Sequence, residues 1–374
     1  MTLKQMLVEM LNRKASDLHI RVGIRPHIRV NGRLEQLSAD PLSIDDMENI
    51  VGQILNESQK ERFQKKNEMD LALSVAKLGR FRINLFRQRG TTGIALRAVN
   101  TVVPSFEELN LPKVIKDLSL ERRGMICVTG TTGSGKSTTM AAMLEHMNAT
   151  RGDNILTVED PIEYIYRDKK CIIGQREVGA DTQSFSAALR HALRQDPDII
   201  MIGEIRDLET MQIALTAADT GHLVLTTLHT LNAVETISRI VSFFPPHQHS
   251  QIRLLLAGTL KAIIGQRLLP RHDMPGRVPA LEIMINTAAI RDALMTPEKV
   301  TSIPDLIEEG DQYGMRSFDQ SIMDLYRRGL ISFEEAMGHC SNPDDFDLRV
   351  KGITGAADRW KNEEDSKVGD TQRY

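Results

Sequence analysis

The sequence is poor in cysteine, in aromatic residues and in long hydrophobic runs. Its 374 residues include three cysteines, Cys127, Cys171 and Cys340, which are far apart in the chain. This spacing excludes a zinc knuckle or a disulfide framework built from neighbouring cysteines and fits a reducing compartment. No apolar run approaches the roughly 18 residues that a membrane-spanning helix needs. The N-terminus, MTLKQMLVEMLNRK, mixes charged and apolar residues, so we expect neither a transmembrane segment nor a secretion signal.

The chain also lacks a strong charge imbalance. Its formal net charge is −3, and 41% of its residues are hydrophobic, as in ordinary globular proteins. A protein that tracks along nucleic acid is usually basic, because contacts to phosphates need lysine and arginine. We therefore expect no nucleic-acid partner. The length exceeds the roughly 100–200 residues typical of one domain, which predicts two domains.

The first hundred residues have the pattern of a small α/β domain. Ser43 can cap a helix that runs through Ile54, and three later segments, 69–75, 81–86 and 93–99, have the composition of β-strands. Residues 101–118 include Pro104 and Pro112 and show little strand or long-helix pattern, which is typical of a linker. The sequence therefore predicts an N-terminal domain over 1–100 and a linker over 101–118.

One stretch of this first domain has no acidic residue. Between Leu71 and Phe106 all the charged side chains are basic. This stretch could be a solvated strand surface without a binding role, or it could be a surface that faces a negatively charged partner. The basic residues are Lys77, Arg80, Arg82, Arg87, Arg89 and Arg97.

A different pattern begins after the linker. Short apolar segments at 125–129, 155–158, 199–202 and 223–227 alternate with stretches of helical pattern at 184–195 and 208–218. This alternation predicts an α/β domain over 119–350, with a mostly parallel sheet covered by helices. The remaining residues, 351–374, are polar and charged, so we expect a disordered tail.

The strongest chemical signal is a glycine-rich loop. It follows a predicted strand, opens a predicted helix and satisfies the pattern G-x-x-x-x-G-K-[ST]. The glycines allow successive backbone N–H groups to face phosphates, the lysine reaches the β- and γ-oxygens, and the hydroxyl suits Mg²⁺. We expect the loop to bind ATP through Gly130, Thr131, Thr132, Gly133, Ser134, Gly135, Lys136, Ser137 and Thr138.

Binding a nucleotide does not by itself imply hydrolysis, which also needs carboxylates near the phosphates. Open α/β sheets bind ligands at the carboxyl ends of their strands. One apolar segment ends at Glu204, and another ends in three acids, Glu159, Asp160 and Glu163. Either group could consist of solvated loop acids, but two such strand ends beside one phosphate loop favour a hydrolytic site.

These motifs resemble those of the secretion-type ring ATPases, and among them the type IV pilus retraction (twitching motility) ATPases. The matching segments are GTTGSGKST, TVEDPIEY (157–164), LRQDPDIIMIGEIRD (193–207) and GHLVLTTLHT (221–230). The similarity extends from ASDLHI (15–20) to about Asp347. It implies a homo-hexameric motor with a PAS-like N-terminal domain and a RecA-like ATPase domain, with ATP bound between subunits.

The resemblance also implies roles for individual residues. Lys136 would hold phosphate, Ser137 would hold phosphate and Mg²⁺, and Glu204 would be the Walker B acid, with Mg²⁺ bound through water. Glu163 would be the general base, supported by Glu159 and Asp160. Three residues of the basic stretch, Arg80, Arg82 and Arg97, would reach the nucleotide.

Several alternatives stay open within this resemblance. Assembly and type II secretion ATPases usually have a longer N-terminus and a four-cysteine motif, so three scattered cysteines favour the retraction class. The late segment Ala289-Ile290-Arg291-Asp292-Ala293-Leu294 departs from the AIRNLI motif of retraction ATPases, which leaves the principal motor and an accessory paralogue both possible. A nucleotide switch without motor activity is a further alternative. The expected partners are an inner-membrane platform protein and a paralogous retraction ATPase, at the cytoplasmic side of the pilus base.

Two histidines lie seven residues apart in GHLVLTTLHT. An extended strand of that length separates them by roughly 20 Å, which one zinc ion cannot bridge. His229, at the carboxyl end of the predicted strand, is the candidate for sensing the γ-phosphate or orienting water. His222, at the opposite end, is expected to have a structural or subunit-contact role.

Overall fold

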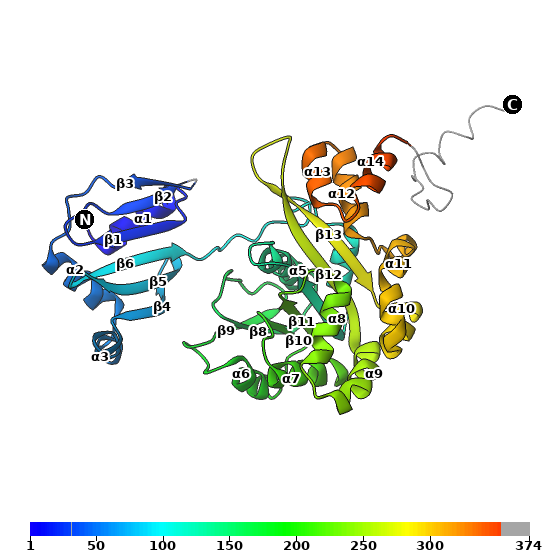
Figure 1. Cartoon of the computed structure of the whole chain (residues 1–374). Helices are drawn as coiled ribbons and strands as arrows, with labels where there is room; N and C mark the ends of the chain where they lie inside the picture. The colour runs from blue at the N-terminus through cyan, green and yellow to red at the C-terminus, as the bar shows by residue number, and fades with distance from the viewer. Residues whose placement is uncertain (31, 353–374) are drawn as a thin grey trace. The chain divides into compact units, whose positions relative to one another are not determined.

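A computed structural model describes residues 1–30 and 32–352 of the chain, and backbone contacts divide them into two compact units. The first unit contains Met1–Val103 and two later segments, Glu159–Arg167 and Gln175–Ser184. The second contains Pro104–Val158, Asp168–Gly174 and the chain from Phe185. Figure 1 labels most of the helices and strands of each unit. The tail expected over 351–374 lies outside the described residues from position 353 on.

The first unit is built on a six-stranded antiparallel sheet with the order β3-β2-β1-β6-β5-β4. The three strands predicted between residues 69 and 99 are confirmed as β4, β5 and β6. The strands are β1 (Asp17–Arg21), β2 (His27–Val30), β3 (Arg33–Gln36), β4 (Glu68–Val75), β5 (Gly79–Gln88) and β6 (Thr91–Ala98).

One face of this sheet is buried and the other carries polar side chains. Along β5, Phe81, Ile83 and Leu85 are at most 1% exposed, so their neighbours Arg80 and Arg82 belong to the opposite face. Helices cover the buried face with apolar residues, and the predicted start of the second helix is confirmed because Ser43 caps it. The helices are α1 (Leu3–Asn12), α2 (Ile44–Ile54) and α3 (Glu57–Lys66).

The second unit is built on a seven-stranded sheet with the order β13-β12-β7-β11-β10-β8-β9. The four strands predicted in this part of the chain are confirmed as β7, β8, β10 and β11, and their pairings are parallel. Strands β7, β10 and β11 are buried along their whole length, as expected of strands covered on both faces. The strands are β7 (Gly124–Thr129), β8 (Asn154–Glu159), β9 (Ile172–Glu177), β10 (Ile199–Ile202), β11 (Leu223–Leu228), β12 (Leu260–Pro270) and β13 (Arg277–Ile285).

Helices flank this sheet (Figure 1). The two helical stretches predicted at 184–195 and 208–218 are confirmed as α6 and α7, so the α/β fold class is also confirmed. The α-helices are α4 (Lys113–Leu118), α5 (Lys136–Thr150), α6 (Phe185–Ala192), α7 (Leu208–Asp219), α8 (Ala233–Ser242), α9 (His249–Thr259), α10 (Ala288–Met295), α11 (Ile303–Glu308), α12 (Phe318–Arg327), α13 (Phe333–His339) and α14 (Pro343–Val350). Within the described part of this unit, 3-10 helices lie between some of these α-helices: η1 (Pro246–Gln248), η2 (Pro297–Ser302) and η3 (Asp311–Tyr313).

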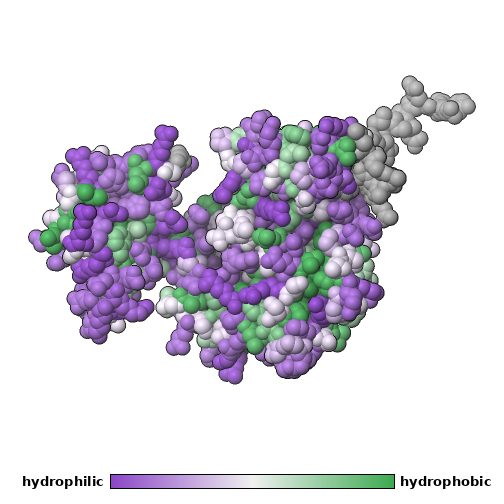
Figure 2. Space-filling view, viewed as in Figure 1, coloured by the Kyte–Doolittle hydropathy of each residue, from purple (hydrophilic) through white to green (hydrophobic). Residues whose placement is uncertain are grey.

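Two features lie outside the predicted pattern. The segment expected as a linker over 101–118 contains α4, and its residues from Pro104 on belong to the second unit. Strands β12 and β13 pair antiparallel and extend the parallel sheet beside β7. The visible surface of each unit is mostly hydrophilic (Figure 2), as expected of a protein with a buried core in each unit.

Candidate functional site: a phosphate loop at the carboxyl edge of the second sheet

The glycine-rich loop lies between the buried strand β7 and the N-terminus of α5. Three of its residues have positive φ: Gly130 (141°), Gly133 (80°) and Gly135 (90°). A Cβ on Gly133 would meet no atom within 4 Å, so this glycine is required by its backbone conformation and leaves open space above the loop. The loop therefore combines a left-handed backbone with the positive end of a 15-residue helix, as an anion site requires.

The side chain of Lys136 contacts the backbone of the phosphate loop. Its ammonium donates to the carbonyl oxygens of Gly130 (2.8 Å) and Thr131 (2.9 Å), and the residue is 8% exposed. The first turn of α5 carries no acidic residue. The positive charge of Lys136 and the helix N-terminus thus act together on any anion held by the loop.

Glu204 and His229 lie together at the same edge of the sheet. They follow β10 and β11, which run parallel with Ile202 opposite Thr226. His229 Nε2 is 3.1 Å from one carboxylate oxygen of Glu204, and Arg206 donates to the other at 2.5 Å. Because β11 also pairs with β7, the strand that leads into the loop, both side chains lie at the loop's edge of the sheet.

The acidic segment begins where β8 ends. β8 pairs with β10 as far as Val158, so Glu159 lies one residue beyond the last pair. Glu159 is 6% exposed, and its carboxylate accepts hydrogen bonds from Gln175 Nε2 (3.3 Å) and from the N–H of Glu163 (3.4 Å). Asp160 and Glu163 are exposed. One acid is therefore held inside the turn, and two are accessible to solvent.

The basic stretch divides between the two faces of the first unit's sheet. Arg82 and Arg97 lie opposite each other on β5 and β6, whereas Arg87 stacks on Phe63, 5.3 Å from the ring centre. Arg80 forms an ion pair at 3.1 Å with Glu177, which also belongs to the first unit. The three arginines predicted to reach nucleotide thus share the polar face.

Arg97 is held by an acid that the sequence did not single out. Its Nε donates to Asp17 at 2.8 Å. Burial raises the pKa of Asp17, but hydrogen bonds from Ser16 and Arg97 outweigh burial, so the pKa is below its ordinary value. Among the residues that the structure describes, Arg82 has no ion-pair partner, which leaves its charge available to a ligand.

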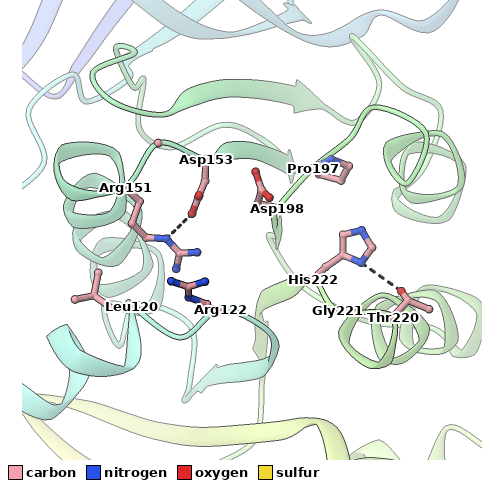
Figure 3. A pocket seen from close by; sticks show the side chains of 10 residues that line it. Leu120, Arg122, Arg151, Asp153, Pro197, Asp198, Thr220, Gly221 and His222 are labelled. Atoms are coloured by element: carbon pink, nitrogen blue, oxygen red, sulfur yellow. Dashed lines mark hydrogen bonds and ion pairs between the residues drawn. The ribbon is translucent and has the colours of Figure 1, made fainter.

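His222 lies at the other end of β11, in a polar hollow of about 670 Å³ (Figure 3). Its Nδ1 is 3.0 Å from the carbonyl oxygen of Ala217 and 3.3 Å from Thr220 Oγ1. Arg122, Asp198 and the ion pair of Arg151 with Asp153 line the same hollow. The two histidines of GHLVLTTLHT therefore belong to opposite edges of the sheet.

Two observations bear on other classes of site. Within residues 1–30 and 32–352, no helix is both long and apolar enough to cross a membrane. Across the same residues, no three histidine, cysteine or acidic side chains are grouped as a metal site would require.

The profile of the family described as type II/IV secretion system protein matches residues 1–291. The chain belongs to this family. Its relatives include the type IV pilus ATPase PilU of Pseudomonas aeruginosa, 41% identical over 94% of this chain and 92% of that protein. The pilus retraction ATPase PilT of the same organism is 43% identical over 92% of this chain and all of that protein.

A solved member of the family has the same arrangement of elements. The crystal structure of the pilus retraction motor PilT with bound ADP superposes with a TM-score of 0.85 at 40% identity. The superposition covers 92% of this chain and 98% of that one. The family assignment and the α/β fold predicted from the sequence are therefore both confirmed.

Proposed function

We propose that this chain is an ATP-hydrolysing motor that drives type IV pilus retraction, as the principal motor or as an accessory paralogue. The observation that carries the proposal is the meeting of the phosphate loop, Glu204 and His229 at one edge of the sheet. It occurs in a chain that matches the ADP-bound motor PilT along nearly its whole length.

The substrate is ATP, held by its phosphates. The loop from Gly130 to Gly135 supplies backbone N–H donors, and Lys136 exchanges its two carbonyl partners for phosphate oxygens. Ser137 and Thr138 follow at the start of α5, where the helix N-terminus favours negative charge.

The residues present also fit Mg²⁺. The hydroxyl of Ser137, which is exposed, and the carboxylate of Glu204 are oxygen ligands of the kind that Mg²⁺ prefers. When bound with ATP, Mg²⁺ would neutralise charge on the β- and γ-phosphates.

Hydrolysis needs an activated water and positive charge around the γ-phosphate. Glu163 is exposed to solvent and serves as the general base, while the buried Glu159 positions the turn that carries it. His229 orients the water or senses the γ-phosphate through its contact with Glu204. Arg82, with Arg80 and Arg97 on the same face, neutralises the charge that develops on the phosphate.

The resemblance supports a larger assembly. We propose a PAS-like domain over residues 1–100 and a RecA-like domain over 119–350, joined in a homo-hexamer with ATP between subunits. The motor acts at the cytoplasmic side of the pilus base on an inner-membrane platform protein, together with a paralogous ATPase. The presence of both PilT and PilU in Pseudomonas aeruginosa, each a relative of this chain, supports the paralogous ATPase.

Phosphate release by the purified protein tests the hydrolysis. Wild-type protein should turn over ATP with Mg²⁺, and Lys136→Ala should abolish it. Turnover that survives both Lys136→Ala and Glu204→Ala would place hydrolysis elsewhere. Nucleotide binding without turnover, and without hexamers in the presence of ATP, would favour a nucleotide switch.

A deletion strain distinguishes the motor classes. Many surface pili on cells that do not twitch indicate the principal retraction motor. An accessory motor is indicated if the single-deletion strain twitches almost normally and twitching is lost when a paralogue is also deleted. Cells without pili would overturn retraction in favour of assembly, which is the runner-up.

A further inference from the structure

We propose that Gln266 is a positioning residue of the phosphate loop, holding both ends of the loop in their nucleotide-binding shape. Gln266 belongs to β12, about 130 residues from the loop in sequence, and no motif of the loop includes it. The inference rests on the proposed nucleotide binding, because the loop's shape matters only if the loop holds phosphate.

The sheet brings Gln266 beside the loop. β12 runs parallel to β7, with Gly265 opposite Thr129, the last residue of β7. One step further along each strand, Gln266 stands next to Gly130, the first residue of the loop. Gln266 is 3% exposed, so its carboxamide is enclosed by protein and its hydrogen bonds contribute to a defined geometry.

A buried hydrogen bond links Gln266 to the helix that follows the loop. Thr139 Oγ1 donates to Gln266 Oε1 at 2.8 Å, and Thr139 is 1% exposed. Thr139 lies in the first turn of α5, where its N–H donates to the carbonyl oxygen of Gly135 at 3.0 Å. The carboxamide therefore ties the end of the loop and the start of α5 to β12.

Two glycines of the loop lie close against Gln266, Gly130 against its backbone carbonyl and Gly135 against its side chain. A Cβ on Gly130 would lie 2.3 Å from the carbonyl oxygen of Gln266, and a Cβ on Gly135 would lie 2.6 Å from its Nε2. Real Cβ atoms do not approach other atoms so closely. The first and last residues of the loop thus both rest against Gln266.

The contact has a consequence for nucleotide binding rather than for folding alone. The N–H groups of the loop bind phosphate only when they point inward together, and a small displacement of a preorganised site reduces affinity strongly. Without the carboxamide, the loop and α5 lose their common anchor, and the hydroxyl of Thr139 is left buried without its acceptor.

The test is the affinity of the full-length protein for Mg²⁺-ADP, measured by calorimetry, together with kcat and KM for ATP. Gln266→Met keeps the length of the side chain but removes its hydrogen bond with Thr139. It should raise the Kd for ADP and the KM for ATP by about tenfold, the effect of one lost hydrogen bond, with a smaller change in kcat. Thr139→Val should act similarly, and the double variant should be little worse than either single one. Thr139→Ser keeps the hydroxyl and should restore affinity to within about twofold of wild type.

Asn286 provides a matched control. It is a buried carboxamide just beyond the far end of the β12–β13 pair, where Nδ2 donates to the carbonyl oxygens of Ala257 (3.0 Å) and Leu260 (2.7 Å). Asn286→Ala should lower the melting temperature without changing ADP affinity. The inference is overturned if Gln266→Met and Thr139→Val bind ADP with wild-type affinity. It is also overturned if Asn286→Ala reduces the affinity for ADP as much as those two variants do. Wild-type protein that binds no ADP would instead overturn the proposed function.

Discussion

The two edges of the second unit's sheet are both polar, and each carries one histidine of the same ten-residue segment. At the carboxyl edge, Glu204 and His229 lie where β7 passes into the phosphate loop and α5. At the amino edge, His222 and Asp198 lie in a hollow (Figure 3) and bond to nearby backbone, at Ala217 and Asn154. The two edges differ because the parallel strands all run toward the carboxyl edge. Parallel strands that pass into helices gather helix N-termini at one edge only, and that edge can hold phosphate.

The largest effect should come from the acid of the carboxyl edge. Glu204→Gln keeps the shape of the side chain but removes its charge, and we expect ATP turnover to fall by about a thousandfold, within the range for groups that assist proton transfer or metal binding. Phosphate release measures the turnover, and ADP binding serves as the control, since it depends mainly on the loop. A fall of less than about tenfold would show that the edge is not the reacting one.

The next largest effect should come from Arg82, which belongs to the first unit and to neither edge of the second sheet. Arg82→Ala should reduce turnover by about a hundredfold, because arginines near a transferring phosphoryl group stabilise developing charge. Nucleotide affinity should change little. Arg87→Ala is the matched control, since Arg87 belongs to the same strand but stacks on Phe63. Equal losses of turnover and affinity in Arg82→Ala would contradict this role and favour a solvated arginine face.

The two histidines test the comparison most directly. His229→Ala removes the contact to Glu204 and should lower turnover by about tenfold, whereas His222→Ala should change it by less than about threefold. His222→Ala should instead lower the melting temperature, because Ala217 and Thr220 lose a hydrogen-bond partner. The measurements are steady-state ATP turnover and the melting temperature of both variants. Similar losses of turnover in the two variants would contradict different roles for the two histidines.

The smallest effect concerns the polar face of the first unit. The pKa of Asp17 is lowered in the folded protein, so its stabilising contribution is present at neutral pH and is lost as the pH falls through the folded value. Asp17→Asn should therefore lower the melting temperature by a few degrees at pH 7, and the difference should shrink below about pH 4, near the ordinary value for aspartate. A difference that does not depend on pH would assign the loss to packing instead of to the ion pair with Arg97.

Much of this site could be predicted from local sequence. The loop pattern lies within nine residues, Glu204 and the three acids follow apolar segments, and the predicted strands at 199–202 and 223–227 match β10 and β11 closely. Strands and helices in an α/β domain have strong local periodicity, which makes them visible one at a time. The direction of β11 then separates His229 from His222 without any knowledge of their neighbours.

The sequence by itself therefore determined the phosphate loop, the polar residues that follow each parallel strand, and the end of the strands at which these residues lie. The tertiary structure alone decided which side chains touch. In the folded chain, Gln266 lies beside the loop and His229 contacts Glu204. Arg97 pairs with Asp17, and Arg87 packs on the other face of the sheet. The physical reason is that these contacts join residues 24 to 127 positions apart. Such pairs leave no periodic trace in the sequence, because they depend on strand order and register.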